Sequence, residues 1–116
     1  MKSIKEDITI EDLDKIDIRV GTIELVEDAE GSDRLVKFTV DFGDLKRTIL
    51  CGMKKERNNP KAEVEGKQAL FVVNLKPRKM FGIESHGMLF DIGYNDGIVP
   101  VLAIPEKEVK NGARAG

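Results

Sequence analysis

The chain has 116 residues, of which 34% are charged and only 5% aromatic. This length is typical of one domain, residues 1–116, whose interior is filled mainly by aliphatic side chains. The single cysteine, Cys51, excludes an internal disulfide, and no apolar stretch reaches the roughly 20 residues that a membrane-spanning helix needs. A cytoplasmic protein that has no membrane partner is therefore expected.

The net charge of −2 conceals an uneven distribution of charge along the chain. Residues 1–33 carry 4 basic and 11 acidic side chains, residues 34–83 carry 12 and 5, and residues 84–116 carry 3 and 5. A middle segment of net charge +7 thus lies between two acidic ends. Because charges are screened over about 8 Å at physiological salt, a polyanion responds to local clusters of cations. The overall acidity does not exclude a nucleic-acid partner.

The first predicted elements are an N-terminal arm and a long strand. Residues 1–14 form the arm, in which Thr9 can cap one helical turn. Asp12 stands three positions later, where an acidic side chain can accept a hydrogen bond from the backbone N–H of the cap residue. Apolar and polar side chains then alternate through residues 16–25, with a slip of phase beside Gly21. A slip at a glycine predicts a bulge or a sharp bend, where a long strand turns a barrel corner.

Four more strands follow from alternation and from short apolar runs bounded by turn residues. They are predicted at residues 36–42, 46–51, 67–75 and 87–92. A polar connection containing Asn58, Asn59, Pro60 and Gly66 separates the third from the fourth. The C-terminal extension, residues 98–116, begins with a segment up to Ile104 that Pro100 and Pro105 mark as an edge strand or extended arm.

Five strands, a bent first strand and a long third connection predict an all-β, five-stranded oligonucleotide-binding (OB) barrel with N- and C-terminal extensions. In such a barrel, the ligand face is framed by the loops that join strands one to two and four to five. These loops are residues 27–34 and 76–86. The second loop is therefore expected at the binding face.

The segment 74–89 has the composition of a binding loop, since three cations, two glycines and a proline lie between two apolar runs. Cationic side chains in such a loop bind phosphates, arginine through a planar fork and lysine as a point charge. Amides and hydroxyls can contact a base edge or a 2′-hydroxyl, and an apolar side chain can contact a base. The candidates in this segment are Lys76, Arg78 and Lys79 for phosphate, Asn74 and Ser85 for polar contacts, and Met88 for apolar contact.

The same residues resemble the signature of a tRNA-binding domain family. The resemblance rests on Asn74-Leu75-Lys76-Pro77, then Lys79, Gly82, Ser85, Gly87 and Met88, together with Asp17-Ile18-Arg19-Val20-Gly21 upstream. The family includes the C-terminal domain or separate beta subunit of methionyl-tRNA synthetase, the endothelial monocyte-activating polypeptide domain and free-standing dimeric tRNA-binding proteins. The likeness covers about residues 13–112, and the tail, residues 105–116, is similar to the C-terminal extension of the dimeric members.

The resemblance implies an OB fold, a tRNA partner and direct tRNA contact by Asn74, Lys79, Ser85 and Met88. Arg34 and Lys37, from the first loop and the second strand, are supporting candidates for RNA binding. Purely structural roles stay open for some residues. Met88 is a possible core filler, Asn74 a brace for its loop, and Arg19 in the first strand a partner for a nearby acid such as Asp17 or Glu24.

Catalysis is not predicted, because Cys51 and His86 are the only nucleophile and base that the chain could pair, and Cys51 lies in an apolar strand. One cysteine and one histidine do not make a zinc site, and no cofactor site is expected. The sequence thus indicates structure-directed tRNA binding, as an accessory or beta subunit of methionyl-tRNA synthetase whose partner is the catalytic chain. The rival hypothesis is an export-related, chaperone-like module of the same fold that binds proteins.

Homodimerisation is a separate prediction. Apolar side chains in the two terminal segments exceed what a small barrel needs to close. They are Ile4, Ile8, Ile10, Val99, Val101 and Leu102. A two-fold axis would place two basic faces on one assembly, and one tRNA could contact both.

Overall fold

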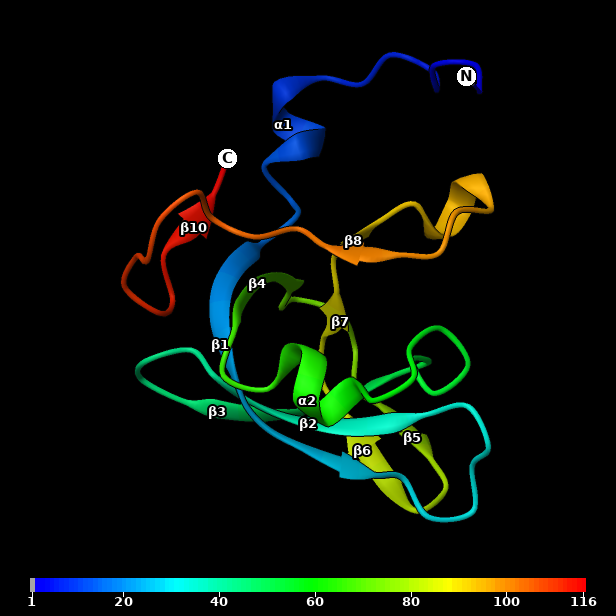
Figure 1. The fold of residues 1–116 in the computed structure, drawn as a ribbon. Coiled ribbons are helices and arrows are strands. Elements are labelled where there is room, and N and C mark those ends of the chain that lie inside the picture. Colours follow the sequence, from blue (N-terminus) through cyan, green and yellow to red (C-terminus); the bar gives the residue numbers. More distant parts are fainter. Residues whose placement is uncertain (1) are drawn as a thin grey trace.

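The computed structural model describes residues 2–116, and its backbone is mostly β (Figure 1). The main sheet contains β1 (Ile18–Asp28), β2 (Val36–Asp41), β3 (Lys46–Cys51), β4 (Gln68–Val72), β7 (Met88–Leu89) and β10 (Arg114–Ala115). Two further antiparallel pairs are β5 (Arg78–Met80) with β6 (Ile83–Ser85), and β8 (Asp91–Ile92) with β9 (Val101–Leu102). The helices are short: α1 (Ile10–Leu13), α2 (Pro60–Val64) and the 3₁₀ helix η1 (Tyr94–Asp96).

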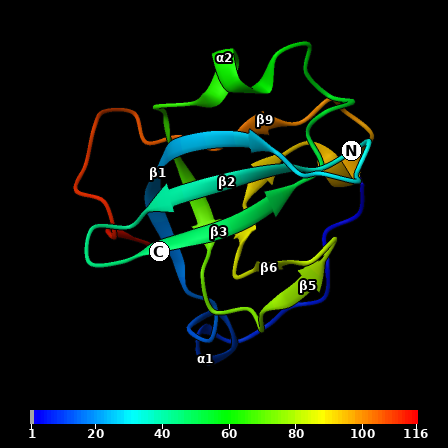
Figure 2. The same cartoon turned by 90° about the horizontal axis from the view of Figure 1, so that it is seen from below.

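The main sheet curls into a barrel of the OB kind, as predicted. Its strand order is β3-β2-β1-β4-β7, all neighbours are antiparallel, and β10 adds to β1. The segment after β6 approaches the free edge of β3, where the backbone N–H of His86 donates to the carbonyl of Thr48 at 3.0 Å. Seen from below, β1, β2 and β3 run side by side, with α2 on one side of them and the β5–β6 hairpin on the other (Figure 2).

The core is filled by the inward side chains of the curled sheet. Alternate residues of β2, from Val36 through Phe38 to Val40, are buried, so the predicted alternation is confirmed. Phe42 and Phe71 meet edge to face, with their ring centroids 5.6 Å apart. Aromatic pairs in this arrangement add a favourable electrostatic contact to the burial of their area.

The bulge in β1 does not lie at Gly21, so the prediction of a bulge at this position was wrong. The sharp bend, the other form predicted there, stays a prediction. The register between β1 and β2 shifts between Ile23 and Leu25, and Leu25 points outward with 38% of its surface exposed. Gly21 is needed for close packing, because a Cβ at this position would lie 2.5 Å from Cγ1 of Val40 and 2.8 Å from Cε1 of Phe42. The missing side chain lets the strand pass close to the core.

Gly21→Ala is expected to lower the free energy of unfolding by about 1–3 kcal/mol, because the added methyl group overpacks the core. Urea unfolding followed by circular dichroism measures the change. Gly52→Ala is the matched control, since the Cβ it adds would meet only the flexible side chain of Arg34. Equal losses of stability in the two variants would contradict the close-packing role of Gly21.

Several elements differ from the sequence-based expectation. The polar connection contains α2, which the Asn59 side chain caps by accepting from the backbone of Ala62, and Val64 of this helix is fully buried. The predicted loop 76–86 contains the β5–β6 hairpin. The fourth strand ends at Val72, the predicted fifth strand is divided into β7 and β8, and β10 was not predicted.

The two terminal segments meet the barrel at β1 and η1. The helical turn predicted from Thr9 is present as α1, with a reciprocal capping box between Thr9 and Asp12. The arm before it reaches η1, where the Lys2 ammonium group donates to the carbonyl of Asn95. None of the helices in residues 2–116 is both long and apolar enough to cross a membrane.

Candidate nucleic-acid interface

The β5–β6 hairpin presents the basic segment. Its register pairs Arg78 with Ser85 and Met80 with Ile83. The two residues of its turn, Phe81 and Gly82, both have positive φ (52° and 74°), the combination found in type I′ turns. The inward side chains of Met80 and Ile83 pack on a small apolar cluster of Ala29, Leu35 and Leu50. The hairpin is thus a folded element fixed to the barrel.

The cations of this region fall into two groups. The side chains of Lys76, Arg78 and Lys79 are exposed and form no ion pair with any residue from 2 to 116. Lys37 lies 3.5 Å from Glu27, so its charge is partly neutralised. Arg34 is exposed, and its guanidinium group lies over Gly52. Of these five cations, the three in the hairpin region are therefore the most available to an anion.

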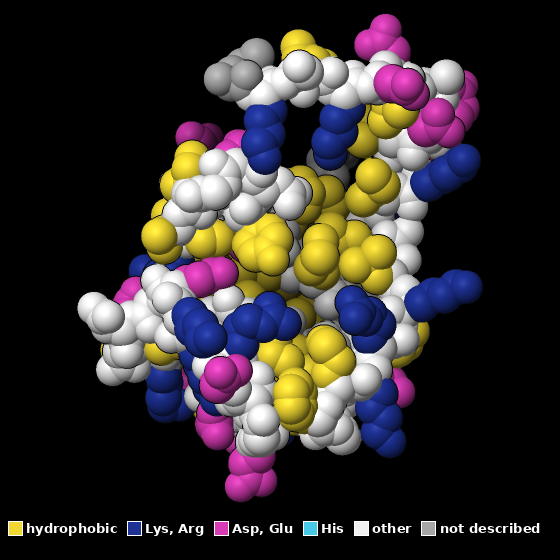
Figure 3. All heavy atoms as spheres, turned by 90° about the vertical axis from the view of Figure 1, so that its right-hand side faces the viewer, with side chains coloured by type: hydrophobic (Ala, Val, Ile, Leu, Met, Phe, Trp, Pro, Cys, Tyr) yellow, Lys and Arg dark blue, Asp and Glu magenta, His cyan; other side chains and the backbone are white. Residues whose placement is uncertain are grey.

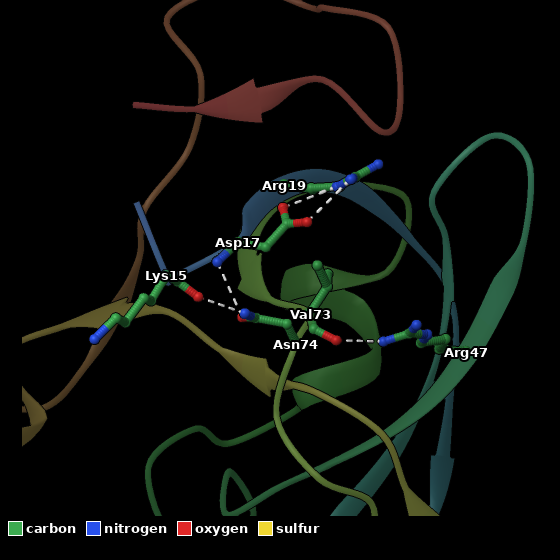
Figure 4. Close-up of polar contacts among 6 residues, drawn as sticks. All are labelled: Lys15, Asp17, Arg19, Arg47, Val73 and Asn74. Atoms are coloured by element: carbon green, nitrogen blue, oxygen red, sulfur yellow. Dashed lines mark hydrogen bonds and ion pairs between the residues drawn. The ribbon is translucent and has the colours of Figure 1, made fainter. Parts of the chain in front are cut away.

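Ser85 and Asn74 hold the backbone in place. Ser85 is only 6% exposed, and its hydroxyl oxygen accepts from the N–H of Leu50 at 3.0 Å. The Asn74 side-chain oxygen accepts from the N–H of Asp17 at 2.9 Å, while its amide nitrogen donates to the carbonyl of Lys15 at 2.6 Å (Figure 4). The bracing role considered for Asn74 is confirmed. Direct RNA contact by either residue stays a prediction.

Two apolar side chains face solvent beside these cations. Met88 is 50% exposed, so it does not fill the core. Phe81, at the tip of the hairpin, is 57% exposed and lies near the first loop, since a Cβ on Gly31 would be 3.4 Å from its Cδ1. Phe81 was missed in the sequence, although an aromatic residue before a glycine in a basic loop is itself a signal. Exposed apolar surfaces of this kind can contact bases.

A polar network follows the end of β4 (Figure 4). The Arg47 guanidinium donates to the carbonyl of Val73 at 2.5 Å. Arg19 donates to both carboxylate oxygens of Asp17, at 2.9 and 3.0 Å, which confirms the acid pairing expected for Arg19. This hydrogen-bonded ion pair lowers the pKa of Asp17. The network fixes the position at which the basic segment begins.

The environment of Cys51 suppresses thiolate chemistry. Burial, and to a smaller extent the nearby Glu56 and Asp91, raise the pKa of the Cys51 thiol to about 12. The thiolate is the reactive form of cysteine, so this thiol is a poor nucleophile at neutral pH. Within residues 2–116, no three His, Cys, Asp or Glu side chains lie close enough together to hold a metal ion.

We expect Cys51 of the folded protein to react with an aromatic disulfide reagent about a thousandfold more slowly near pH 8 than an ordinary thiol, because the shift from 9.0 to about 12 reduces the thiolate fraction. Absorbance of the released thiol measures the rate. The urea-unfolded chain is the control and should react fast. Equal rates in the two states would contradict a thiol that the fold keeps protonated.

The curled barrel and its flanking basic hairpin place the protein among modules of the oligonucleotide-binding kind. The tRNA binding domain family matches residues 18–114, which is most of the chain. The protein therefore belongs to this family, as its sequence signature predicted.

Relatives with known names agree with this assignment. Methionine--tRNA ligase of Archaeoglobus fulgidus is 44% identical over 110 residues, which are 95% of this chain and 16% of that protein. The same ligase of Parabacteroides distasonis is 43% identical over 112 residues, 97% of this chain and again 16% of the relative. The chain thus spans a small part of the length of these enzymes.

Solved structures with the same fold include a MetRS-related protein and a CsaA chaperone. The MetRS-related protein of Pyrococcus horikoshii superposes with a TM-score of 0.86 and 38% identity, covering 97% of this chain and 100% of that one. The chaperone CsaA of Bacillus anthracis superposes with a TM-score of 0.81 and 26% identity, covering 96% and 100%.

Proposed function

We propose that the protein binds folded tRNA without reacting with it, as an accessory or beta subunit of methionyl-tRNA synthetase. The observation that carries this proposal is the set of three exposed cations, Lys76, Arg78 and Lys79, on and beside a hairpin that is fixed to the barrel. Membership of the tRNA binding domain family and the likeness to methionine--tRNA ligases support it. By binding tRNA, the protein raises the local concentration of tRNA for a catalytic site on another chain.

Each proposed RNA-binding residue has a distinct task. The hairpin cations neutralise phosphates of the tRNA body, and Arg34 and Lys37 extend the basic surface towards the first loop. Met88 offers an apolar surface to a base. Asn74 and Ser85 act mainly by fixing the loop and hairpin, and they keep the cations in one geometry before RNA arrives. A preorganised site loses less entropy on binding.

A binding assay with three ligands tests this proposal. The log affinity for tRNA should fall with log salt by about 0.7 to 0.9 for each phosphate neutralised, because cations on the protein release counterions from the RNA. Total tRNA, an unstructured RNA of similar length and an unfolded protein are compared by gel shift or anisotropy. We expect preference for tRNA over both. Salt-independent affinity, or equal binding of the unstructured RNA, would contradict recognition of the folded tRNA.

A second candidate function is protein binding, because the chaperone CsaA of Bacillus anthracis shares the fold across the full length of that chain. An apolar surface that holds an extended peptide would not need the hairpin cations. Binding of the unfolded protein that survives alanine replacement of Lys76, Arg78 and Lys79 would favour this function over tRNA binding.

We further propose that the protein forms a homodimer through its terminal segments. Ile4 in the arm is 85% exposed, and apolar side chains of β8, β9 and the segment before β9 are also largely exposed. Hydrophobic side chains gather in the space between the arm and the barrel, and the arm stands clear of the barrel above them (Figure 3). A second copy that covers this face would bury them and complete the assembly.

Sedimentation at micromolar concentration should show twice the mass of one chain. Val101→Asp places a charge on the exposed face of β9 and is expected to produce monomers, because the charge would be desolvated in a dimer. Leu25→Asp, on an exposed part of β1, is the control and should remain dimeric. A wild-type monomer at this concentration would rule out the dimer.

A further inference from the structure

A cavity of about 640 Å³ lies beside the hairpin region and shares only Lys76 with the three proposed phosphate-binding cations. It is bounded by the start of β1, the turn between β2 and β3, the end of β4 and the loop before β10, residues 110–113. Its volume falls within the range of about 300–1,000 Å³ that is typical of small-ligand sites. One small molecule or one nucleotide could fit.

Positive charge dominates the lining of this cavity. The cations are Arg19, Arg47, Lys76 and Lys110, and the acids are Asp17 and Asp44. Arg19 is neutralised by Asp17 through two hydrogen bonds. The Arg47 guanidinium is oriented by its bond to the Val73 carbonyl, and it keeps other N–H groups for an anion. The balance leaves a cavity that favours a negatively charged group.

The cavity also has apolar walls formed mainly by side chains that are not buried in the core. Leu45 and Leu75 both line it, and they are 47% and 42% exposed. Phe42, whose ring packs on Phe71, also lines the cavity although it is only 5% exposed. Apolar side chains beside cations match the two chemical parts of a nucleotide, because a base can pack on the former and a phosphate can bind the latter.

Asn111 also lines this cavity, and its side chain is held in a fixed orientation. The Asn111 side-chain oxygen accepts from the Thr22 hydroxyl at 3.0 Å and from the Gln68 amide at 2.9 Å. These two bonds fix the orientation of the carboxamide, so its NH₂ group is left to donate to a ligand. Such a donor can bond to a base edge or to a ribose hydroxyl.

We propose that this cavity receives one unstacked nucleotide of the bound RNA, with its phosphate at Arg47 and Lys110 and its base against Leu45 and Leu75. The inference rests on the proposed tRNA binding and adds a second contact to it. Lys76 lines the cavity and Arg78 begins β5 two residues later, so the cation set is continuous from the hairpin to the cavity. An RNA strand that follows the hairpin can therefore place its next unpaired nucleotide in the cavity.

The test uses the full chain and four small probes: adenosine 5′-monophosphate, adenosine, inorganic phosphate and an acidic peptide. Amide chemical shifts report where each probe binds. The monophosphate should shift residues 44–47 and 110–113 and bind at least about tenfold more tightly than adenosine or phosphate, because only it has both chemical parts. Lys110→Ala and Leu45→Ala should each weaken tRNA binding about tenfold, whereas Lys107→Ala and Leu25→Ala, outside the cavity, should not. Thermal melting confirms that the variants are folded.

The outcomes separate this inference from the proposed function. If the cavity variants bind tRNA as well as wild type, the inference fails while tRNA binding stands. Occupation of the cavity by the acidic peptide and not by the monophosphate would also overturn it, in favour of a protein ligand. If wild type does not bind tRNA, the proposed function fails, and the inference about bound RNA fails with it even if the cavity accepts the monophosphate.

Discussion

Replacing Lys76, Arg78 and Lys79 together by alanine is expected to weaken tRNA binding by about 100-fold at roughly 0.1 M salt. The slope of log affinity against log salt concentration should also become shallower by about 2 to 3. The reason is that each of these exposed cations releases counterions from the RNA when it neutralises a phosphate. Since none of the three forms an ion pair within residues 2–116, their removal leaves no acid without its partner. Fluorescence anisotropy across a series of salt concentrations measures both effects.

A control of equal charge separates the site from the net charge of the protein. Lys61, Lys67 and Lys107 replaced by alanine change the net charge by the same three units. Lys61 lies on α2, on the opposite side of the β1–β3 strands from the hairpin (Figure 2). We expect this variant to lose no more than a few-fold in affinity, from the weaker long-range field alone. Equal weakening by the two triple variants would show that the hairpin has no special role.

Phe71→Ala is expected to have the largest effect on stability, lowering the free energy of unfolding by about 3–5 kcal/mol. Phe71 is fully buried in β4, where it is paired with Arg19 of β1 and Leu89 of β7. Its loss removes the edge-to-face contact with Phe42 and leaves a cavity where three strands meet. Chemical unfolding followed by circular dichroism gives the change in free energy.

Leu25→Ala provides the comparison for Phe71→Ala, because Leu25 lies in the same sheet but is substantially exposed. Its expected cost is about 0.5 kcal/mol or less. The Phe71 variant should keep its tRNA affinity at low temperature, in proportion to its folded fraction, since Phe71 lies inside the barrel. A cost below about 1 kcal/mol would mean that the core rearranges to fill the space.

The regular parts of the fold could be predicted because their signals are local. Alternation identified β2, and Thr9 with Asp12 identified the capped turn of α1. The bulge in β1 was misplaced because Ile23 and Leu25 alternate in the sequence, whereas the shift of register between them turns Leu25 outward. Register depends on the neighbouring strand, and this partner is not visible in a strand's own sequence.

The hairpin was read as a loop for a different reason. Arg78, Lys79 and Met80 do not alternate in the way that predicts a strand, and the type I′ turn has Phe81 where asparagine or glycine is usual. Packing of Met80 on the small apolar cluster stabilises the hairpin, although the local sequence does not favour a strand. The N-terminus of α2, in contrast, has a signal in the sequence, because Asn59 is a favourable N-cap and Pro60 a favourable first helical residue.

For the candidate site, the sequence identified which segment is basic and could not identify which polar groups point inward. A serine in a polar stretch carries no sign that its hydroxyl will accept from Leu50, a residue on another strand. The cavity was missed because Arg47, Lys76 and Lys110 are far apart in the chain and meet only when β3, the end of β4 and the C-terminal loop come together.

The small cluster beneath the hairpin joins the hairpin to the first loop. Ala29 and Leu35 bracket the first loop, and Met80 and Ile83 belong to the hairpin, so the same few contacts support both. These contacts lie outside the larger core formed around Phe38 and Phe71. Because the hairpin and the first loop rest on the same few contacts, a substitution that weakens this cluster is expected to disturb both loops together while the main core keeps the barrel folded.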